Sequence, residues 1–187
     1  MQAAVNTEQL VGNRYRIGIF VSLASIAMLF TSLSSAYIVR SGVTYDWYPI
    51  AVPRVMFGST ALLLLGSVSI EIARRKLKQS LSGAYSKYLL LTLLLGLGFL
   101  VSQLISWRQL AAQGLYISTH PHSSFFYVLT GMHAVHLIGG LAWFGVVLAQ
   151  VRRMALTPGE DGLRLFATYW HFLSGLWVYL LVLLFVM

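Results

Sequence analysis

The chain alternates long apolar stretches with short polar segments. Five stretches stand out, covering approximately residues 17–39, 53–73, 88–107, 125–150 and 165–187. A helix needs about 20 apolar residues to cross the hydrocarbon core of a bilayer, and each stretch reaches that length. We therefore predict an all-α, polytopic membrane bundle of five transmembrane helices, with residues 1–187 forming a single membrane domain.

The first stretch has one competing interpretation, a cleaved signal peptide. Ser34, Ser35 and Ala36 resemble the small-residue site at which such peptides are cut. The apolar run continues beyond them, however, and is longer than the roughly 7 to 15 residues that a signal peptide uses. A membrane-spanning helix is the better prediction for this stretch.

The basic residues between the stretches predict an orientation. Ten lie in the segments on one side: Arg14, Arg16, Arg74, Arg75, Lys76, Lys78, Lys87, Arg152, Arg153 and Arg164. Three lie on the other side: Arg40, Arg54 and Arg108. Because cytoplasmic loops carry the excess of Lys and Arg, we expect the N-terminus in the cytoplasm and the C-terminus outside.

The composition supports a membrane protein and excludes several other classes. Hydrophobic residues make up 58% of the chain and charged residues 10%, against a usual charged share of about 25%; the mean hydropathy is +0.75. Soluble, disordered and nucleic-acid-binding proteins are thereby excluded, although the net charge is +8. The chain has no cysteine, so it can form neither a disulfide nor a thiolate metal site.

The five carboxylates all lie outside the middle of the apolar stretches. Glu71 is at the inner edge of the second stretch, Glu8 precedes the first stretch, and Asp46, Glu160 and Asp161 lie between stretches. Proton relays, carboxylate-bridged metal pairs and ion-coordinating transporter sites normally need an acid at depth. The chain alone is therefore a poor candidate for a pump, and five spans do not divide into the paired halves of an inverted-repeat transporter.

Histidines are the polar residues that do lie at depth. His133 and His136 share one face of the fourth helix with Gly140, and His171 lies on the fifth helix. A rise of 1.5 Å per residue places His136 roughly 16 Å from one membrane face and His171 roughly 9 Å from the other, so we expect these helices to meet through them. Packing, a proton or water path, and haem ligation all remain open; the lack of acids to orient them favours packing.

Other polar and small residues have simpler interpretations. His120 and His122, beside Pro121, look like solvated loop residues. Trp170 and Trp177 lie within the fifth span, where an indole N–H needs a hydrogen-bond partner. Several glycines of the fourth stretch suggest close approach of other helices, within the chain or in a larger complex: Gly131, Gly139, Gly140 and Gly145.

A basic cluster ends the second stretch. Arg74, Arg75, Lys76 and Lys78 are candidates for contacts with anionic lipid headgroups, each worth about 1 kcal/mol near the membrane surface. The alternative is that these residues only determine the topology. No metal-binding or catalytic residues are predicted.

Two segments resemble subunit III of the haem–copper respiratory oxidases, the family that includes cytochrome c oxidase subunit III. The first is Gly131-Met132-His133-Ala134-Val135-His136-Leu137-Ile138-Gly139-Gly140, and the second is Tyr169-Trp170-His171-Phe172 followed by Trp177. Weaker matches lie upstream: Ser25, Ala36-Tyr37, Val52-Pro53, Gly66-Ser67-Val68-Ser69-Ile70 and Gln103. The chain is similar to the short bacterial form with five helices.

The resemblance implies an accessory subunit of a terminal oxidase in the bacterial inner membrane. In such a complex haem and copper belong to partner subunits I and II, whereas this chain carries no catalytic centre, binds phospholipid and supports subunit I. Alternatives that stay open are a subunit III-like partner of a nitric oxide reductase or quinol oxidase, a small transporter, and a haem-binding membrane anchor.

The chain departs from the family pattern at three positions where the family often has an acid. These positions are occupied by Ile26, Ser106 and Ser174. A role in proton transfer through a buried carboxylate is therefore not carried over from the resemblance. We expect a structural contribution instead.

Overall fold

The computed structural model describes residues 2–43, 53–79, 84–154 and 160–186. Within these ranges the regular structure is entirely helical. The helices are α1 (Gln2–Val43), α2 (Val55–Lys78), α3 (Ala84–Ala112), α4 (Pro121–Met154) and α5 (Glu160–Val186). In the described part of the chain, five helices are thus long and apolar enough to cross a membrane, which confirms the fold class predicted from the apolar stretches.

The helix ends follow from local chemistry and extend beyond the predicted spans. α4 begins at Pro121, at the first helical position where the missing N–H of proline costs nothing. α3 ends in a Schellman motif: Gly114 has a φ of 79°, and the amide of Leu115 donates to the carbonyl of Leu110 at 3.1 Å. α2 ends with Arg75, Lys76 and Lys78 in its last turn, where cations interact favourably with the helix dipole.

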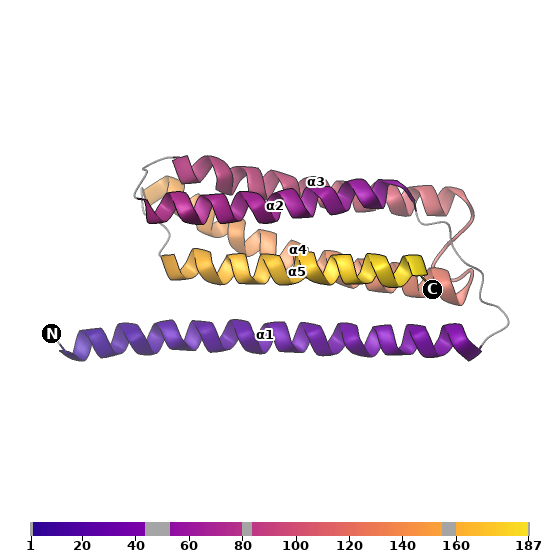
Figure 1. The fold of residues 1–187 in the computed structure, drawn as a ribbon, viewed down its shortest axis with the longest axis horizontal. Helices are drawn as coiled ribbons and strands as arrows, with labels where there is room; N and C mark the ends of the chain where they lie inside the picture. Colours follow the sequence, from indigo (N-terminus) through magenta and orange to yellow (C-terminus); the bar gives the residue numbers. More distant parts are fainter. Residues whose placement is uncertain (1, 44–52, 80–83, 155–159, 187) are drawn as a thin grey trace.

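The helices run alternately up and down (Figure 1). α2 and α3 lie side by side, α5 lies between them and α1, α4 crosses obliquely behind α5, and α1 lies at the edge. α5 packs against α2, α4 and α1, whereas among the described residues α1 packs only against α4 and α5. The two termini lie at opposite ends of the bundle, as an odd number of spans requires.

Trp170 packs α5 against α2 and α3. Its side chain is buried on α5, and its ring lies against Gly66 on α2 and Gly96 on α3. A Cβ atom built on Gly66 would be 2.7 Å from Cζ2 of Trp170, and one built on Gly96 would be 2.9 Å from Cη2. Only glycine leaves room for the indole at these two points.

Of the four glycines of α4 expected to allow close approach, one does so in the structure. A Cβ atom on Gly140 would be 2.5 Å from Cε1 of Tyr169 on α5. A Cβ atom on Gly131, Gly139 or Gly145 would have no neighbouring atom within 4 Å. No described helix of this chain approaches closely at these three positions, so close approach there remains a prediction for helices of a larger complex.

α1 is the least enclosed of the five helices. Only 22% of its most apolar segment is buried, against 44% for α4 and α5. Its outward face exposes large apolar side chains, including Ile17, Phe20, Val21 and Met28. This edge of the bundle is therefore suited to contact with lipid or with another membrane subunit.

Candidate functional site

His133 lies at the point where four helices meet. Its side chain is fully buried on α4 and is enclosed by aromatic rings from the three neighbouring helices. The ring centroid lies 6.5 Å from that of Phe30 on α1, 5.7 Å from Phe99 on α3 and 5.1 Å from Trp177 on α5. Neither ring nitrogen has a hydrogen-bond partner among the described residues, so His133 joins the helices through ring packing.

His136 contributes through its own helix. Its Nδ1 donates to the carbonyl of Met132 at 2.7 Å, and its ring packs against Phe30 at 5.8 Å. The carbonyl of His136 in turn accepts a hydrogen bond from the hydroxyl of Tyr169 on α5 at 2.7 Å. α4 and α5 are therefore linked at this residue by its backbone and not by its imidazole.

His171 lies apart from the other two histidines. It is exposed and lines an open groove between α1 and α5, of about 420 Å³, together with Ala27, Phe30 and Tyr179. No ring contact in the described part of the chain joins it to His133 or His136. The expected contact through all three histidines is wrong. Successive residues of an α-helix point about 100° apart. His171, which follows Trp170, is therefore turned away from the buried face of α5 that carries Trp170 and Trp177.

Aromatic rings from three neighbouring helices surround His133, and His171 faces a different surface. Within the described residues, no group of three or more His, Asp or Glu side chains is placed to hold a metal ion.

Neutral hydrogen bonds connect neighbouring helices through the interior. Three of them reach α2: Gln103 Nε2 on α3 donates to Ser59 Oγ at 3.1 Å, and Trp177 Nε1 on α5 donates to Thr60 Oγ1 at 3.0 Å. The third joins Ser67 Oγ on α2 to Ser174 Oγ on α5 at 3.1 Å. The fourth joins α3 to α4, where Trp107 Nε1 donates to Thr130 Oγ1 at 3.1 Å. Trp177 thus has the partner that its indole needs. Trp170 Nε1 has none among the described residues and is held by packing alone.

The three positions at which the resemblance leads one to expect an acid are all buried in this structure. Ser174 donates to the carbonyl of Trp170 at 2.9 Å, and Ser106 donates to the carbonyl of Ser102 at 3.0 Å. Ile26 belongs to the apolar core. Each position therefore holds a neutral group that fits its surroundings without a charge.

His122 makes a contact that the sequence pattern does not predict. His122 is not a solvated loop residue: it lies in the first turn of α4, is buried, and its Nε2 is 3.1 Å from the hydroxyl of Tyr37 on α1. The expectation was wrong because α4 begins at Pro121, earlier than the apolar pattern suggests. Proline as a first helical residue was the available signal.

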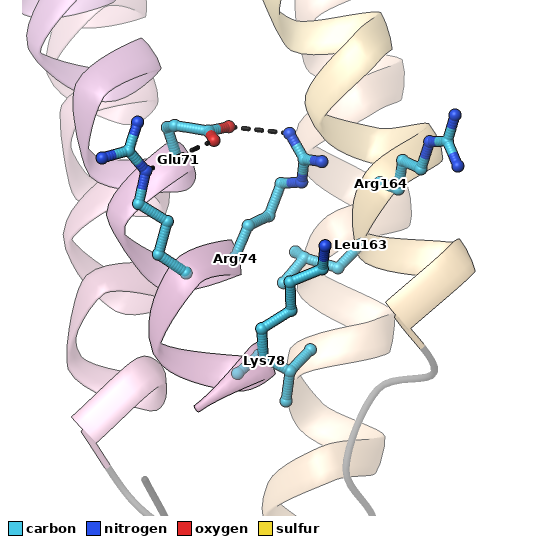
Figure 2. Close-up of a pocket in the computed structure, with 7 residues that line it drawn as sticks. Glu71, Arg74, Lys78, Leu163 and Arg164 are labelled. Carbon is cyan, nitrogen blue, oxygen red and sulfur yellow. Dashed lines mark hydrogen bonds and ion pairs between the residues drawn. The ribbon is translucent and has the colours of Figure 1, made fainter. Parts of the chain in front are cut away.

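The basic cluster borders a pocket where α2 ends and α5 begins (Figure 2). Arg74, Arg75 and Lys78 line it, and Arg164 joins them from α5, a residue that the sequence placed only on one side of the membrane. Lys76 is not among the lining residues. Glu71 accepts a hydrogen bond from Nη1 of Arg74 at 2.7 Å and lies 3.7 Å from Nε of Arg75.

Comparison with known proteins identifies the family to which the chain belongs. The sequence model described as Cytochrome c oxidase subunit III matches residues 4–187. The chain belongs to the cytochrome c oxidase subunit III family. The resemblance carried by the fourth and fifth helices is therefore confirmed, and membership implies that the chain assembles into an oxidase complex as a multi-pass membrane protein.

Relatives of this chain come from oxidases of more than one kind. The chain is 27% identical to a cytochrome bo(3) ubiquinol oxidase subunit 3 of Pseudomonas putida, covering 87% of this chain and 80% of the relative. It is 28% identical to a probable cytochrome c oxidase subunit 3 of Nocardia farcinica, with 89% and 84% covered. It is also 28% identical to a quinol oxidase subunit 3 of Bacillus subtilis, with 88% and 82% covered.

Proposed function

We propose that this chain is the non-redox accessory subunit III of a terminal haem–copper oxidase in a bacterial inner membrane. Haem, copper and the reaction with oxygen belong to its partners, subunits I and II. The contribution of this chain is to stabilise subunit I and to bind phospholipid. The observation that carries the proposal is the family match over nearly the whole chain, residues 4–187.

The interior supports a structural contribution. The hydrogen bonds that cross between helices join neutral groups, and the positions Ile26, Ser106 and Ser174 carry no charge. Within the described residues of the five spans, Glu71 is the single carboxylate. We accordingly assign His133, His136, Trp170 and Trp177 to the packing of α4 and α5, and leave His171 outside this group.

The charge distribution supports a cytoplasmic N-terminus. The last turn of α2 and the first turns of α3 and α5 lie at the same end of the bundle as the N-terminus. Most of the basic residues belong to that end. By the positive-inside rule this end faces the cytoplasm. Arg74, Arg75, Lys76 and Lys78 are then placed at the level of anionic headgroups of the inner leaflet.

The electron donor is a property of the partner subunits in this proposal. Relatives named as cytochrome c oxidase and as quinol oxidase subunits are equally similar to the chain, at 28% identity each. A subunit without redox groups can serve both kinds of oxidase. The same helical bundle therefore suits either donor.

The proposal is tested by comparing the oxidase with and without this chain. In solubilised membranes we expect the haem of subunit I to keep its Soret absorbance in both samples, but to lose it at a lower temperature when this chain is absent. Equal temperatures would contradict a stabilising role. Solute flux through vesicles that contain the purified chain alone would instead support a transporter.

A further inference from the structure

The pocket between the end of α2 and the beginning of α5 is lined by basic side chains and by two leucines (Figure 2). It has a volume of about 380 Å³. Its lining consists of Glu71, Arg74, Arg75, Leu77, Lys78, Leu163 and Arg164. The lining thus contains four cations and a single carboxylate, which leaves an excess of positive charge.

The carboxylate of Glu71 forms ion pairs with two of the four cations and with neither of the other two. Glu71 pairs closely with Arg74, whose side chain is 32% exposed, and more distantly with Arg75, which is 76% exposed. Lys78 and Arg164 have no anionic partner among the described residues. Figure 2 shows Lys78 reaching from α2 into the space between the two helices, on the side where Arg164 lies.

The position of the pocket fits a ligand at the membrane surface. Lys78 is the last residue of one candidate span, and Gly162 is the first of the other. The pocket therefore opens where the hydrocarbon core gives way to the phosphate layer.

We infer that this pocket is a binding site for one phosphate group, held by Lys78 and Arg164 while the Glu71–Arg74 pair fixes its wall. The phosphate comes from an anionic phospholipid of the inner leaflet or from free phosphate, and the same cations recognise both. The inference deepens the phospholipid contact proposed above, because it names two residues from different helices. Arg164 is the residue that the inference adds to the basic cluster, because the spacing of residues along the second span alone does not indicate it.

The inference is tested with the full-length chain in a neutral detergent, by native mass spectrometry during titration with phosphatidylglycerol. The pocket variant is Lys78→Gln with Arg164→Gln. The matched control is Lys76→Gln with Lys87→Gln, which removes the same charge at the same end of the bundle from residues that do not line the pocket. Phosphatidylcholine serves as the uncharged reference lipid, and circular dichroism checks that both variants are helical.

We expect the pocket variant to bind phosphatidylglycerol about 25-fold more weakly, since a cation near an anionic surface is worth about fivefold in binding. The control variant should lose less than about fivefold, because its cations act only through the general surface potential. Equal losses in the two variants would overturn the pocket while leaving general lipid binding intact. No preference for phosphatidylglycerol in the unchanged protein would overturn both the pocket and the proposed anionic lipid contact.

A second arm identifies the source of the phosphate. Millimolar inorganic phosphate is added to the unchanged chain after it has bound phosphatidylglycerol. Displacement of the lipid assigns the site to free phosphate, and retention assigns it to the lipid; each outcome supports a phosphate site only if the pocket variant shows the loss described above. Neither arm depends on assembly with an oxidase, so failure of the proposed function can be distinguished from failure of this site.

Discussion

The fit of Trp170 between α2 and α3 makes a sharp prediction for Gly66→Ala. The added methyl group would lie 2.7 Å from Cζ2 of the indole and 3.2 Å from Cε2. Gly96 on α3 borders the adjacent ring atom, where a Cβ would be 2.9 Å from Cη2, so the same edge of the indole is in close contact with two helices. Overpacking of this kind costs about 1–3 kcal/mol.

Gly58→Ala is the matched control for this substitution. Gly58 lies on the same helix, and an added methyl group there would have no neighbour within 4 Å. Both variants gain the same intrinsic helix propensity, so the difference between them isolates the contact with Trp170. For a chain of this length, 1 kcal/mol corresponds to about 2–4 °C in Tm, and we expect Gly66→Ala to melt about 2–12 °C below Gly58→Ala.

The assay is thermal unfolding of the full-length chain in detergent, followed by circular dichroism. A second pair of variants places Leu at position 170, with and without Gly66→Ala. Because Trp170→Leu removes the indole, the penalty at position 66 should largely disappear, which gives a coupling energy of about 1–3 kcal/mol. Equal melting of Gly66→Ala and Gly58→Ala would refute the packing argument.

The remaining predictions concern polar groups. Tyr169→Phe removes the hydrogen bond to the carbonyl of His136, and we expect a loss of about 0.6 kcal/mol and at most about 1.7 kcal/mol in the unfolding free energy, as for other hydrogen bonds within membranes. Thr60→Val removes the acceptor of Trp177 Nε1 and leaves a buried indole N–H without a partner, which should cost about 1–3 kcal/mol. A hydrophobic carbodiimide should modify, within the described spans, Glu71 alone, as mapped by peptide mass spectrometry.

Matched substitutions separate these effects from general destabilisation. Tyr179→Phe changes an exposed tyrosine on the same helix as Tyr169, and Thr31→Val changes an exposed threonine whose hydroxyl donates only to its own helix, at the carbonyl of Ala27. Both should leave stability nearly unchanged. Losses as large as those of Tyr169→Phe and Thr60→Val would contradict the assigned hydrogen bonds. Carbodiimide modification deeper in a described span would contradict the placement of the acids.

The sequence was sufficient to predict the five helices, because the length of an apolar stretch is set by the thickness of the bilayer. It was less informative at helix ends, where polar residues continue a helix beyond the membrane. α4 shows the consequence: the helix begins at Pro121, so His122 is buried against Tyr37 instead of lying in a solvated loop. Hydropathy does not locate the end of a helix that continues into polar residues.

Side-chain contacts depended on how each helix is rotated, which the spacing of polar residues alone did not determine. His171 and Trp170 are neighbours in the sequence, yet Trp170 is buried and His171 is exposed. The glycines that matter most, Gly66 and Gly96, were also not distinguished beforehand, because their importance comes from a tryptophan on another helix. Likewise, Arg164 joined the basic cluster only once α5 was placed beside α2.

The central claim is that this chain is subunit III of a haem–copper oxidase and carries no redox group itself. Its most direct test is affinity purification of the tagged chain in a mild detergent, with mass spectrometry and absorption spectroscopy of the co-purifying proteins. We predict that subunits I and II are recovered together with a Soret band, and that the band stays with subunit I when the subunits are separated. Recovery of the chain without any haem–copper subunit, or a Soret band that remains with this chain, would contradict the claim.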